Sequence, residues 1–316
     1  MGPPVSGPGG LRHRSRQTRS ESLGQTRAVL RPLRLGKDSG PCRMGPFSGI
    51  PEPHTPCQEG RAGARMGKLP QPDVELARKV LPATLLEAIR HVFRQGVSGC
   101  MLVGGTALAG YYAGHRRSDD MDLCTRDPDS QKAAALAVES LAPAGYAVTV
   151  VQRTPQYFKT VCRSGEGPFT IDVSLHQHLF SVAKAVSAED GVAVADIETL
   201  LRLKAAALVS RCSEKDLYDL LWLLPRFEEM DLPKLVGLAR SLDAGASPEG
   251  LLISVLGARL DEESCAFATD PAKDKKAVYR EILLLRDWLK KGLQRLAGDQ
   301  PVPPLGELVR KIRRFL

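Results

Sequence analysis

Three aspartates crowd four positions near the middle of the chain, with a spacing that suits cation binding. Asp119, Asp120 and Asp122 form this run. On an extended strand, Asp120 and Asp122 point to one face while Met121 and Leu123 point to the other. At about 4 Å and an effective dielectric of about 20, two like charges repel by roughly 4 kcal/mol, which a divalent cation would cancel. Carboxylate oxygens suit Mg²⁺ or Mn²⁺, so we expect a metal site here. A solvated acidic turn is the alternative.

A third carboxylate and a glycine turn favour the metal-site interpretation. In the strand-like segment 169–173 (FTIDV), Asp172 lies alone on one face, so it can approach the first two acids from a neighbouring strand. Gly104, Gly105 and Thr106 lie between a short apolar run and an Ala-rich segment. Backbone N–H groups and a hydroxyl in such a turn can hold a phosphate at a helix N-terminus. The turn matches neither the dinucleotide fingerprint nor a P-loop.

Periodicity predicts the elements that must position these residues. Apolar residues spaced three and four apart predict helices, whereas β-branched and aromatic runs between turn residues predict strands. The predicted helices cover 83–94, 106–112, 132–141, 275–296 and most of 197–224, and the predicted strands cover 100–103, 121–124, 147–151, 157–162 and 169–175. The fold class is therefore α+β, with a small mixed β-sheet core and flanking helices over residues 66–195. A helical C-terminal region follows over residues 196–316.

The first 65 residues differ in composition from the rest of the chain. They contain 11 Gly and 9 Pro, in strings that fit neither helical nor strand periodicity. We expect a disordered Gly/Pro/Arg-rich arm. The alternative is an over-long start, with the working protein beginning at Met66.

Composition excludes several classes of protein. No apolar run approaches the roughly 20 residues of a bilayer span, so membrane pores and transporters are excluded. Seven scattered cysteines without a CxxC pair argue against a disulfide framework or a clustered zinc site, and indicate the cytoplasm. The formal net charge of +8 hides an acidic centre, because residues 66–272 carry 21 basic and 27 acidic side chains. A single broad basic face for nucleic acid is therefore not expected.

Three sequence blocks carry the residues discussed above and the helices predicted after them. They are GGTALAGYYAGHRRSDDMDL at 104–123, FTIDVS at 169–174 and LRLKAAALVSRCSEKDLYDLLWLL at 201–224. Together they resemble the AbiEii/AbiGii family of nucleotidyltransferase toxins, a branch of the polymerase-β-like nucleotidyltransferase superfamily. The resemblance covers about residues 80–225, and the blocks fall in the expected order. Thr106 replaces the serine of the family's glycine-serine turn, and the spacer before the D-x-D motif is longer than in the family.

The resemblance implies roles for the site residues. Asp120, Asp122 and Asp172 would be metal ligands, with a nucleotidyltransferase core around them. Lys204 would approach the triphosphate, and Asp216 would be the first acid of the family's K-D-x-x-D block. The remaining nucleotide contacts would come from Gly104, Gly105, Thr106 and, beside the acidic run, Arg117.

Several of these residues also have plainer interpretations. Lys204 could be a lysine that extends from an apolar helix to water. Asp219 could pair with Lys215 on a helix surface. Arg116 or Arg117 could contact phosphate or merely balance the neighbouring aspartates. The histidines His115, His176 and His178 are expected to be loop residues rather than metal ligands.

The resemblance also implies a function. The chain would be a metal-dependent cytoplasmic enzyme that transfers a nucleoside monophosphate (NMP) from a nucleoside triphosphate (NTP) to a hydroxyl. Its acceptor would be an RNA such as a tRNA 3′ end, and an antitoxin would neutralise it, as in abortive infection. A small-molecule acceptor of the aminoglycoside type is the first alternative, which the acidic centre favours. A nucleotide-binding interaction module without catalytic activity is the second.

Overall fold

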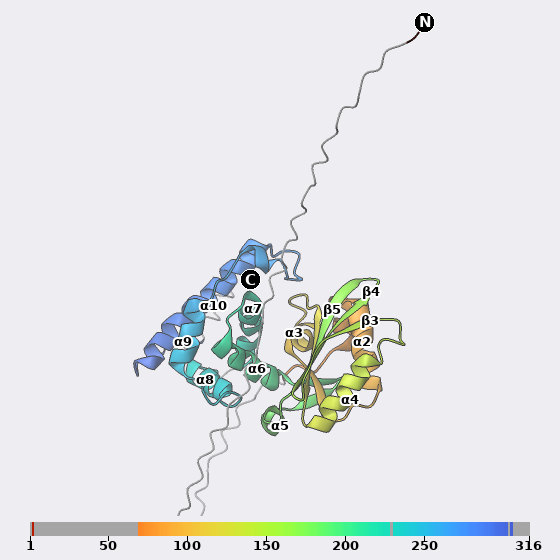
Figure 1. Ribbon diagram of the computed structural model, residues 1–316. Coiled ribbons are helices and arrows are strands. Elements are labelled where there is room, and N and C mark those ends of the chain that lie inside the picture. Colours follow the sequence, from red (N-terminus) through yellow and green to blue (C-terminus); the bar gives the residue numbers. More distant parts are fainter. Residues whose placement is uncertain (1, 3–68, 228–229, 303, 306–316) are drawn as a thin grey trace, which may run out of the picture. The chain divides into compact units, whose positions relative to one another are not determined.

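Asp120, Asp122 and Asp172 lie on strands of one mixed β-sheet, which Figure 1 shows with its flanking helices. The computed structural model describes residues 2, 69–227, 230–302 and 304–305, so the predicted arm lies outside the described residues apart from Gly2. In spatial order, the described strands are β3 (Ala147–Arg153), β4 (Tyr157–Ser164), β5 (Gly167–Leu175), β2 (Asp120–Thr125), β1 (Cys100–Val103), β7 (Ala193–Ala195) and β6 (Ala185–Ser187). The β2–β5 and β1–β7 pairs are parallel, and the other neighbours are antiparallel.

Alternation along the central strands separates an apolar face from a polar one. Met121 and Leu123 of β2 and Ile171 and Val173 of β5 are fully buried, whereas the residues between them are partly exposed or exposed. Side chains at every second position share one face of a sheet. The hydrophobic core therefore fixes which face presents Asp120, Asp122 and Asp172.

Helices surround the sheet and continue beyond it in the chain. They are α1 (Val74–Val80), α2 (Ala83–Arg94), α3 (Gly104–Leu108), which runs into the π-helical turn η1 (Ala109–Ala113), α4 (Pro128–Glu139), α5 (Leu179–Val182), α6 (Ile197–Ser210), α7 (Glu214–Leu223), α8 (Leu232–Arg240), α9 (Pro248–Gly257) and α10 (Lys275–Ala297). The short 3₁₀ turns η2 (Leu224–Arg226) and η3 (Glu263–Cys265) complete the described elements. Helices α2 and α4 pack along the sheet, and α3 contacts both the sheet and α6 (Figure 1).

Side-chain caps explain where most of the longer helices begin. Asp127, Asp196, Ser213, Asp231 and Ser247 each occupy an N-cap and accept a backbone N–H from the first turn. Such caps satisfy donors that a helix leaves unpaired and stabilise it by about 1 kcal/mol each. The cap at Ser213 matters for the site, because it fixes the start of α7.

The helical second part is held by an apolar core. Helix α10 packs against α7, α8 and α9, and α6 packs against α7, α8 and α9. The stripe Ile282, Leu285, Leu289 and Leu293 of α10 is fully buried, as expected from its spacing of three and four residues. None of the helices in the described part of the chain is both long enough and apolar enough to span a bilayer.

The predicted fold class is confirmed, and the differences are local. All five predicted strands are present, and the helix over 83–94 has the predicted limits. Helix α4 begins at Pro128, earlier than the predicted residue 132, because Asp127 caps it. Helix α3 begins directly at Gly104, so no separate turn lies between it and β1. The short strands β6 and β7 and the helices α1, α5, α8 and α9 were not predicted.

Candidate active site

The register of β2 and β5 brings the predicted carboxylates together. The two strands are parallel, with Asp122 directly opposite Asp172 and Asp120 directly opposite Thr170. The Thr170 hydroxyl donates to Asp120 Oδ1 at 2.6 Å. The sequence-based expectation that Asp172 approaches the first two acids from a neighbouring strand is thus met. We call Asp120, Asp122 and Asp172 the acidic cluster.

Asp122 carries the electrostatic strain of the acidic cluster. Burial, together with the negative charges of Asp172 and Asp120, raises the pKa of its carboxyl to about 6, although Lys204 and Arg211 act in the opposite direction. Both leading causes penalise the charged carboxylate. A bound cation would relieve them, so the site has the character of a cation-binding site.

Two side chains of β4 bind the carboxylate of Asp172, one by an ion pair and one by a hydrogen bond. Lys159 Nζ lies 3.0 Å from Asp172 Oδ2, and the Tyr157 hydroxyl donates to Asp172 Oδ1. Burial and this hydrogen bond raise the pKa of Tyr157, so it stays a neutral donor. Both carboxylate oxygens of Asp172 therefore contact other side chains. Asp120, by contrast, accepts a hydrogen bond from the neutral hydroxyl of Thr170. Sequence reasoning missed Tyr157 and Lys159, because only the β4–β5 register shows that they face Asp172.

The two glycines that begin α3 lie against the acidic cluster. Gly104 has a φ of +71°, and a Cβ built on it would lie 2.1 Å from Asp122 Oδ2. A Cβ on Gly105 would lie 2.4 Å from an Arg116 guanidinium nitrogen. The backbone thus approaches two charged groups so closely that a Cβ at either position would force the charged side chain to shift. Thr106 is buried and hydrogen-bonds to Ser118 Oγ at 2.9 Å and to the Asp120 carbonyl oxygen, so its hydroxyl braces the start of β2.

A buried ion network joins the segment before β2 to helices α6 and α7. Asp219 Oδ1 lies 2.6 Å from Arg116 Nε and 2.8 Å from His115 Nε2, and Asp219 Oδ2 lies 2.8 Å from Arg116 Nη2. Lys204 Nζ lies 2.6 Å from Asp219 Oδ2 and 2.9 Å from Asp216 Oδ1. We call Arg116, Lys204, Asp216 and Asp219 the ion network.

Mutual pairing keeps the ion network charged although it is buried. Burial opposes the charged form of Asp219, but Lys204 and Arg116 outweigh it and hold the pKa well below its usual value. Burial likewise opposes the charged form of Lys204, but Asp219 and Asp216 raise its pKa. Buried charges persist only when paired and hydrogen-bonded in this way.

Lys204 and Asp219 show why long-range contacts matter for interpreting this sequence. Lys204 is only 7% exposed, so it does not extend to water, and its ammonium donates to the ion network. Its charge still acts on Asp122. Asp219 is fully buried while Lys215 is exposed, so the suggested surface pair between them is wrong.

Asp216 contacts a second basic side chain besides Lys204, that of Arg211, which reaches the solvent. Arg211 Nε lies 3.1 Å from Asp216 Oδ2, and the Ser213 hydroxyl donates to the same oxygen at 2.7 Å. The Arg211 side chain is 55% exposed, and its charge also acts on Asp122. Arg211 is thus a positive group near the acidic cluster that solvent can reach, and the sequence analysis did not single it out.

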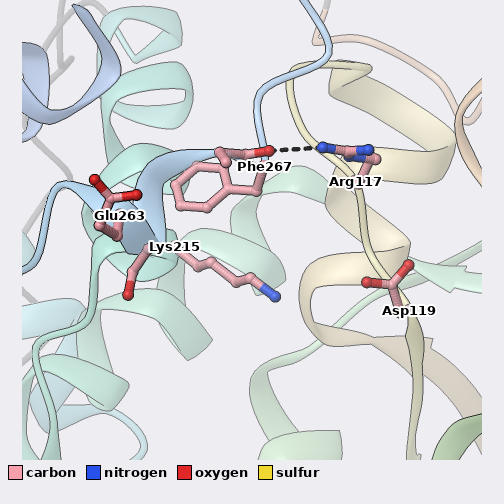
Figure 2. A pocket seen from close by; sticks show the side chains of 7 residues that line it. Arg117, Asp119, Lys215, Glu263 and Phe267 are labelled. Carbon is pink, nitrogen blue, oxygen red and sulfur yellow. Dashed lines mark hydrogen bonds between the residues drawn. The ribbon is translucent and has the colours of Figure 1, made fainter. Parts of the chain in front are cut away.

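Arg117 borders a cavity of about 300 Å³ beside the acidic run. Its backbone N–H donates to the Phe267 carbonyl at 2.8 Å, and its guanidinium donates to the Ala266 carbonyl at 2.6 Å. Figure 2 shows Arg117 and Asp119 on one side of this cavity and Lys215, Glu263 and Phe267 on the other. Arg117 is therefore anchored to the loop before α10, with its exposed side chain at the cavity.

The donor chemistry of the acidic cluster fits a hard cation, although the described part of the chain holds no ready-made ligand cage. Among the described residues, no group of three His, Cys, Asp or Glu side chains forms a recognisable metal site. Asp120 and Asp122 nevertheless share one face of β2, and the raised pKa of Asp122 marks the place where negative charge is in excess. Of the predicted loop histidines, His178 hydrogen-bonds to the Ser241 carbonyl at 2.8 Å, whereas His115 contacts Asp219 of the ion network through Nε2.

Comparison with known proteins identifies a family. The sequence pattern of the family described as nucleotidyl transferase AbiEii toxin, type IV toxin–antitoxin system, matches residues 87–284, which is more than half of the chain. No curated protein sequence matches the chain significantly.

Two solved structures are similar to this chain at low identity. JHP933 from Helicobacter pylori is 19% identical, with a TM-score of 0.43, over 69% of this chain and 97% of its own. The nucleotidyltransferase toxin MenT4 from Mycobacterium tuberculosis is 18% identical, with a TM-score of 0.44, over 73% of this chain and 90% of its own.

Proposed function

This chain belongs to the AbiEii family of nucleotidyl transferase toxins, and we propose that it transfers an NMP from an NTP to a hydroxyl in a metal-dependent reaction. The observation that carries the proposal is the pairing of Asp122 with Asp172 across β2 and β5, against the close backbone of Gly104. This arrangement concentrates negative charge beside the two glycines that begin α3, which is the chemistry expected of a metal and phosphate site.

Asp120 and Asp122 would hold Mg²⁺ or Mn²⁺, with Asp172 as the third acid of the site. A divalent cation in such a site neutralises phosphate oxygens and favours attack on phosphorus. Hydroxyl groups already brace Asp120 and Asp172 through Thr170 and Tyr157. These braces keep both carboxylates in position before any ligand arrives.

The reaction itself exchanges one bond for another. The acceptor hydroxyl oxygen forms a bond to the α-phosphorus of the NTP, the bond from that phosphorus to the β-phosphate oxygen breaks, and pyrophosphate leaves. The hydroxyl proton leaves to solvent water, because the cation that Asp122 would hold offsets the repulsion that favours protonation of this carboxylate. No covalent bond to the protein is needed.

Positive groups near the acidic cluster would receive the triphosphate. Arg211 is half-exposed and acts electrostatically on Asp122, and Arg117 borders the neighbouring cavity. Backbone N–H groups of Gly104 and Gly105 at the start of α3 add further donors. Lys204, held by Asp216 and Asp219, would act on the phosphates through its charge and by fixing α7 against α6.

We further propose that the acceptor is an RNA, such as a tRNA 3′ end, and that a cognate antitoxin restrains the enzyme. The support is family membership, since the family is described as belonging to a type IV toxin–antitoxin system. The acidic balance of residues 66–272 favours the alternative of a cationic small-molecule acceptor.

An assay of transfer from radiolabelled NTPs tests both the proposed reaction and the proposed acceptor. The protein would be incubated with each NTP and Mg²⁺, together with either total RNA or a panel of aminoglycosides. Label in RNA supports the RNA acceptor, and label only in an aminoglycoside replaces it. Label in neither, with no pyrophosphate formed, contradicts nucleotidyl transfer to these acceptors. The Asp122→Asn variant is the negative control.

A further inference from the structure

Helix α10, the long blue helix of Figure 1, carries an excess of positive charge on its exposed side. Its sequence contains seven basic and two acidic residues. One of the acids, Glu281, is buried and paired with Lys273 at 2.8 Å, so Asp287 is the one acid that α10 exposes. Residues 66–272, by contrast, contain more acidic than basic side chains. Among the described elements, α10 is therefore a place where an anionic partner would meet positive charge.

Four of the basic residues lie in the C-terminal half of α10. All four are exposed or partly exposed, whereas the apolar stripe of α10 is buried. Residues four apart in a helix are neighbours on its surface, separated by about 6 Å along the axis. These residues therefore form one continuous surface, which we call the α10 basic face. It consists of Arg286, Lys290, Lys291 and Arg295.

The α10 basic face is not neutralised by acids of the described part of the chain. At the beginning of α10, Lys275 pairs with Glu263 of the turn η3. No such ion pair involves the four residues of the α10 basic face or the exposed Asp287, as far as the structure describes the chain. Like charges that lie within a Debye length, about 10 Å at 0.1 M salt, repel one another. A bound polyanion would relieve this repulsion.

The α10 basic face begins close to residues that border the acidic cluster. Helix α10 packs against α7. Burial raises the pKa of the Cys212 thiol, and the positive charge of Arg286 opposes this rise. Arg211, the residue before Cys212, contacts Asp216 at 3.1 Å, and its charge acts on Asp122. Basic groups thus continue from the acidic cluster to the C-terminal half of α10.

The composition of this surface fits an RNA better than a membrane or a protein. A helix that binds a membrane surface turns an apolar face outward, but none of the large apolar side chains exposed on the described surface belongs to α10. The centre of a protein interface is depleted in charged residues, whereas the α10 basic face consists of them. Contacts from Lys and Arg to phosphates, in contrast, supply most of the affinity for nucleic acids.

We propose that the α10 basic face binds the phosphate backbone of the acceptor RNA, on the 5′ side of the nucleotide that receives the NMP. This inference rests on the proposed function, because it takes the RNA 3′ end to lie at the acidic cluster. A polymer with its end there must continue over the neighbouring surface, which a small acceptor need not do. Contacts to phosphates carry no base information, so this surface contributes affinity without sequence preference.

The salt dependence of RNA binding tests the proposal. Fluorescence anisotropy of a short single-stranded RNA, labelled at its 5′ end, gives the affinity at several KCl concentrations without NTP or divalent metal. The logarithm of the affinity falls against the logarithm of the salt concentration with a slope of roughly −0.7 per phosphate contact. The test variant combines Arg286→Gln, Lys290→Gln, Lys291→Gln and Arg295→Gln. We expect it to bind at least about tenfold more weakly at about 0.1 M KCl, with a slope flatter by roughly 2–3.

A second quadruple variant controls for net charge. It removes four exposed basic side chains outside α10, so both variants have the same net charge. We expect the control to keep the affinity and the salt slope of the wild type within about twofold, because only contacts to phosphate contribute to the slope. Labelled poly-glutamate, an acidic polypeptide, is the competing probe and should bind more weakly than the RNA. The control combines Arg94→Gln, Lys132→Gln, Arg163→Gln and Lys184→Gln.

Each result decides the proposal. Absence of RNA binding by the wild type overturns it, as do unchanged affinity and slope in the test variant or equal losses in the two variants. Tighter binding of poly-glutamate than of RNA also overturns it and assigns the surface to an acidic protein. If the test variant does not fold, the double variant Lys290→Gln/Lys291→Gln replaces it, and unchanged affinity there overturns the proposal.

The outcome for this surface is distinguishable from the outcome for the reaction, because the binding assay contains no NTP. Weaker binding by the test variant, together with no transfer in the NTP assay, would support the surface and contradict the reaction. Transfer to RNA by the wild type, with unchanged binding by the test variant, would leave the reaction standing and overturn the surface.

Discussion

Arg116 and Asp219, which are 103 positions apart in the chain, form a buried bidentate ion pair. Their side chains are 3% and 0% exposed. The pair ties the segment that leads into β2 to helix α7, and thereby fixes Asp120 and Asp122 relative to Arg211 and Lys204. The packing of the fold and the geometry of the proposed active site thus depend on the same contact.

A double-mutant cycle measures this coupling. We expect Arg116→Met and Asp219→Asn each to lower the free energy of unfolding by about 3–5 kcal/mol, because each removes a charged partner from a buried ion network. The double variant should lose about 2 kcal/mol less than the sum of the two. Denaturant unfolding provides the values, and the exposed pair Arg126–Asp127, at 3.1 Å, is the control with a coupling below about 1 kcal/mol. Additive losses at Arg116 and Asp219 would contradict the role given to the pair.

Asp122→Asn should stabilise the protein when no metal is present. The folded-state pKa of Asp122, about 6, lies above its ordinary value. An aspartate of this kind favours folding below its unfolded pKa, and that advantage disappears as the pH rises through about 6. Removing the charge should therefore add roughly 1–3 kcal/mol at pH 7 and almost nothing at pH 4. Melting temperatures of both proteins with EDTA at these two pH values are the measurement. Equal melting temperatures at pH 7 would show that Asp122 is not strained.

Gly104→Ala should damage the site beyond the effect of backbone conformation. Gly104 and Gly96 share a φ of +71°, but a Cβ at Gly96 meets nothing within 4 Å, whereas one at Gly104 lies 2.1 Å from Asp122 Oδ2. Both alanine variants should lose about 1 kcal/mol from the positive φ. Only Gly104→Ala should lose nucleotide transfer, because it displaces the carboxylate. Equal transfer by the two variants would remove Gly104 from the site.

Lys204→Met should destabilise the protein in a pH-dependent way. Its ammonium holds the pKa values of Asp216 and Asp219 below their usual range against the effect of burial. The stability that these depressed pKa values provide is present above the unfolded pKa of aspartate and is lost as the pH falls below it. The loss caused by Lys204→Met, measured by urea unfolding, should therefore be larger at pH 7 than at pH 3.5. A loss independent of pH would indicate that Lys204 contributes by packing alone.

Truncation tests the prediction for the first 65 residues, which lie outside the described part of the chain apart from Gly2. A chain that begins at Met66 should keep the melting temperature and transfer rate of the full chain, because the Gly/Pro-rich composition cannot supply a packed core. Differential scanning fluorimetry and the NTP assay compare the two proteins. A melting temperature lower by several degrees would show that residues 1–65 stabilise the fold.

Local sequence patterns were sufficient for the strands of the site. Apolar and acidic residues alternate around Asp120 and Asp122, and around Asp172. Because the period of a strand is two residues, this alternation predicts on which face of its strand each aspartate lies. The approach of these acids followed from that pattern. The parallel pairing of β2 with β5 did not, since it depends on the order of strands that are distant in sequence.

The partners of charged residues could not be obtained from local patterns. Lys215 is close to Asp219 in sequence, yet Asp219 pairs with Arg116, His115 and Lys204. Tyr157 and Lys159 reach Asp172 only because β4 and β5 are neighbours. In each case the two residues in contact are so far apart in the chain that the spacing between them does not predict the contact. The apolar surroundings of Lys204 were the one local signal of its burial.

Pyrophosphate release coupled to a mass increase tests the central claim most directly. The protein would be incubated with RNA, one NTP and Mg²⁺, and the pyrophosphate formed would be compared with the NMP found on the RNA by mass spectrometry. We predict equal amounts of the two for the wild-type protein and for Asp129→Asn, which alters an exposed acid on α4. We predict a loss of at least about 100-fold for Asp122→Asn. Transfer by Asp122→Asn at a rate near that of the wild type would contradict the assignment of the acidic cluster as the catalytic site.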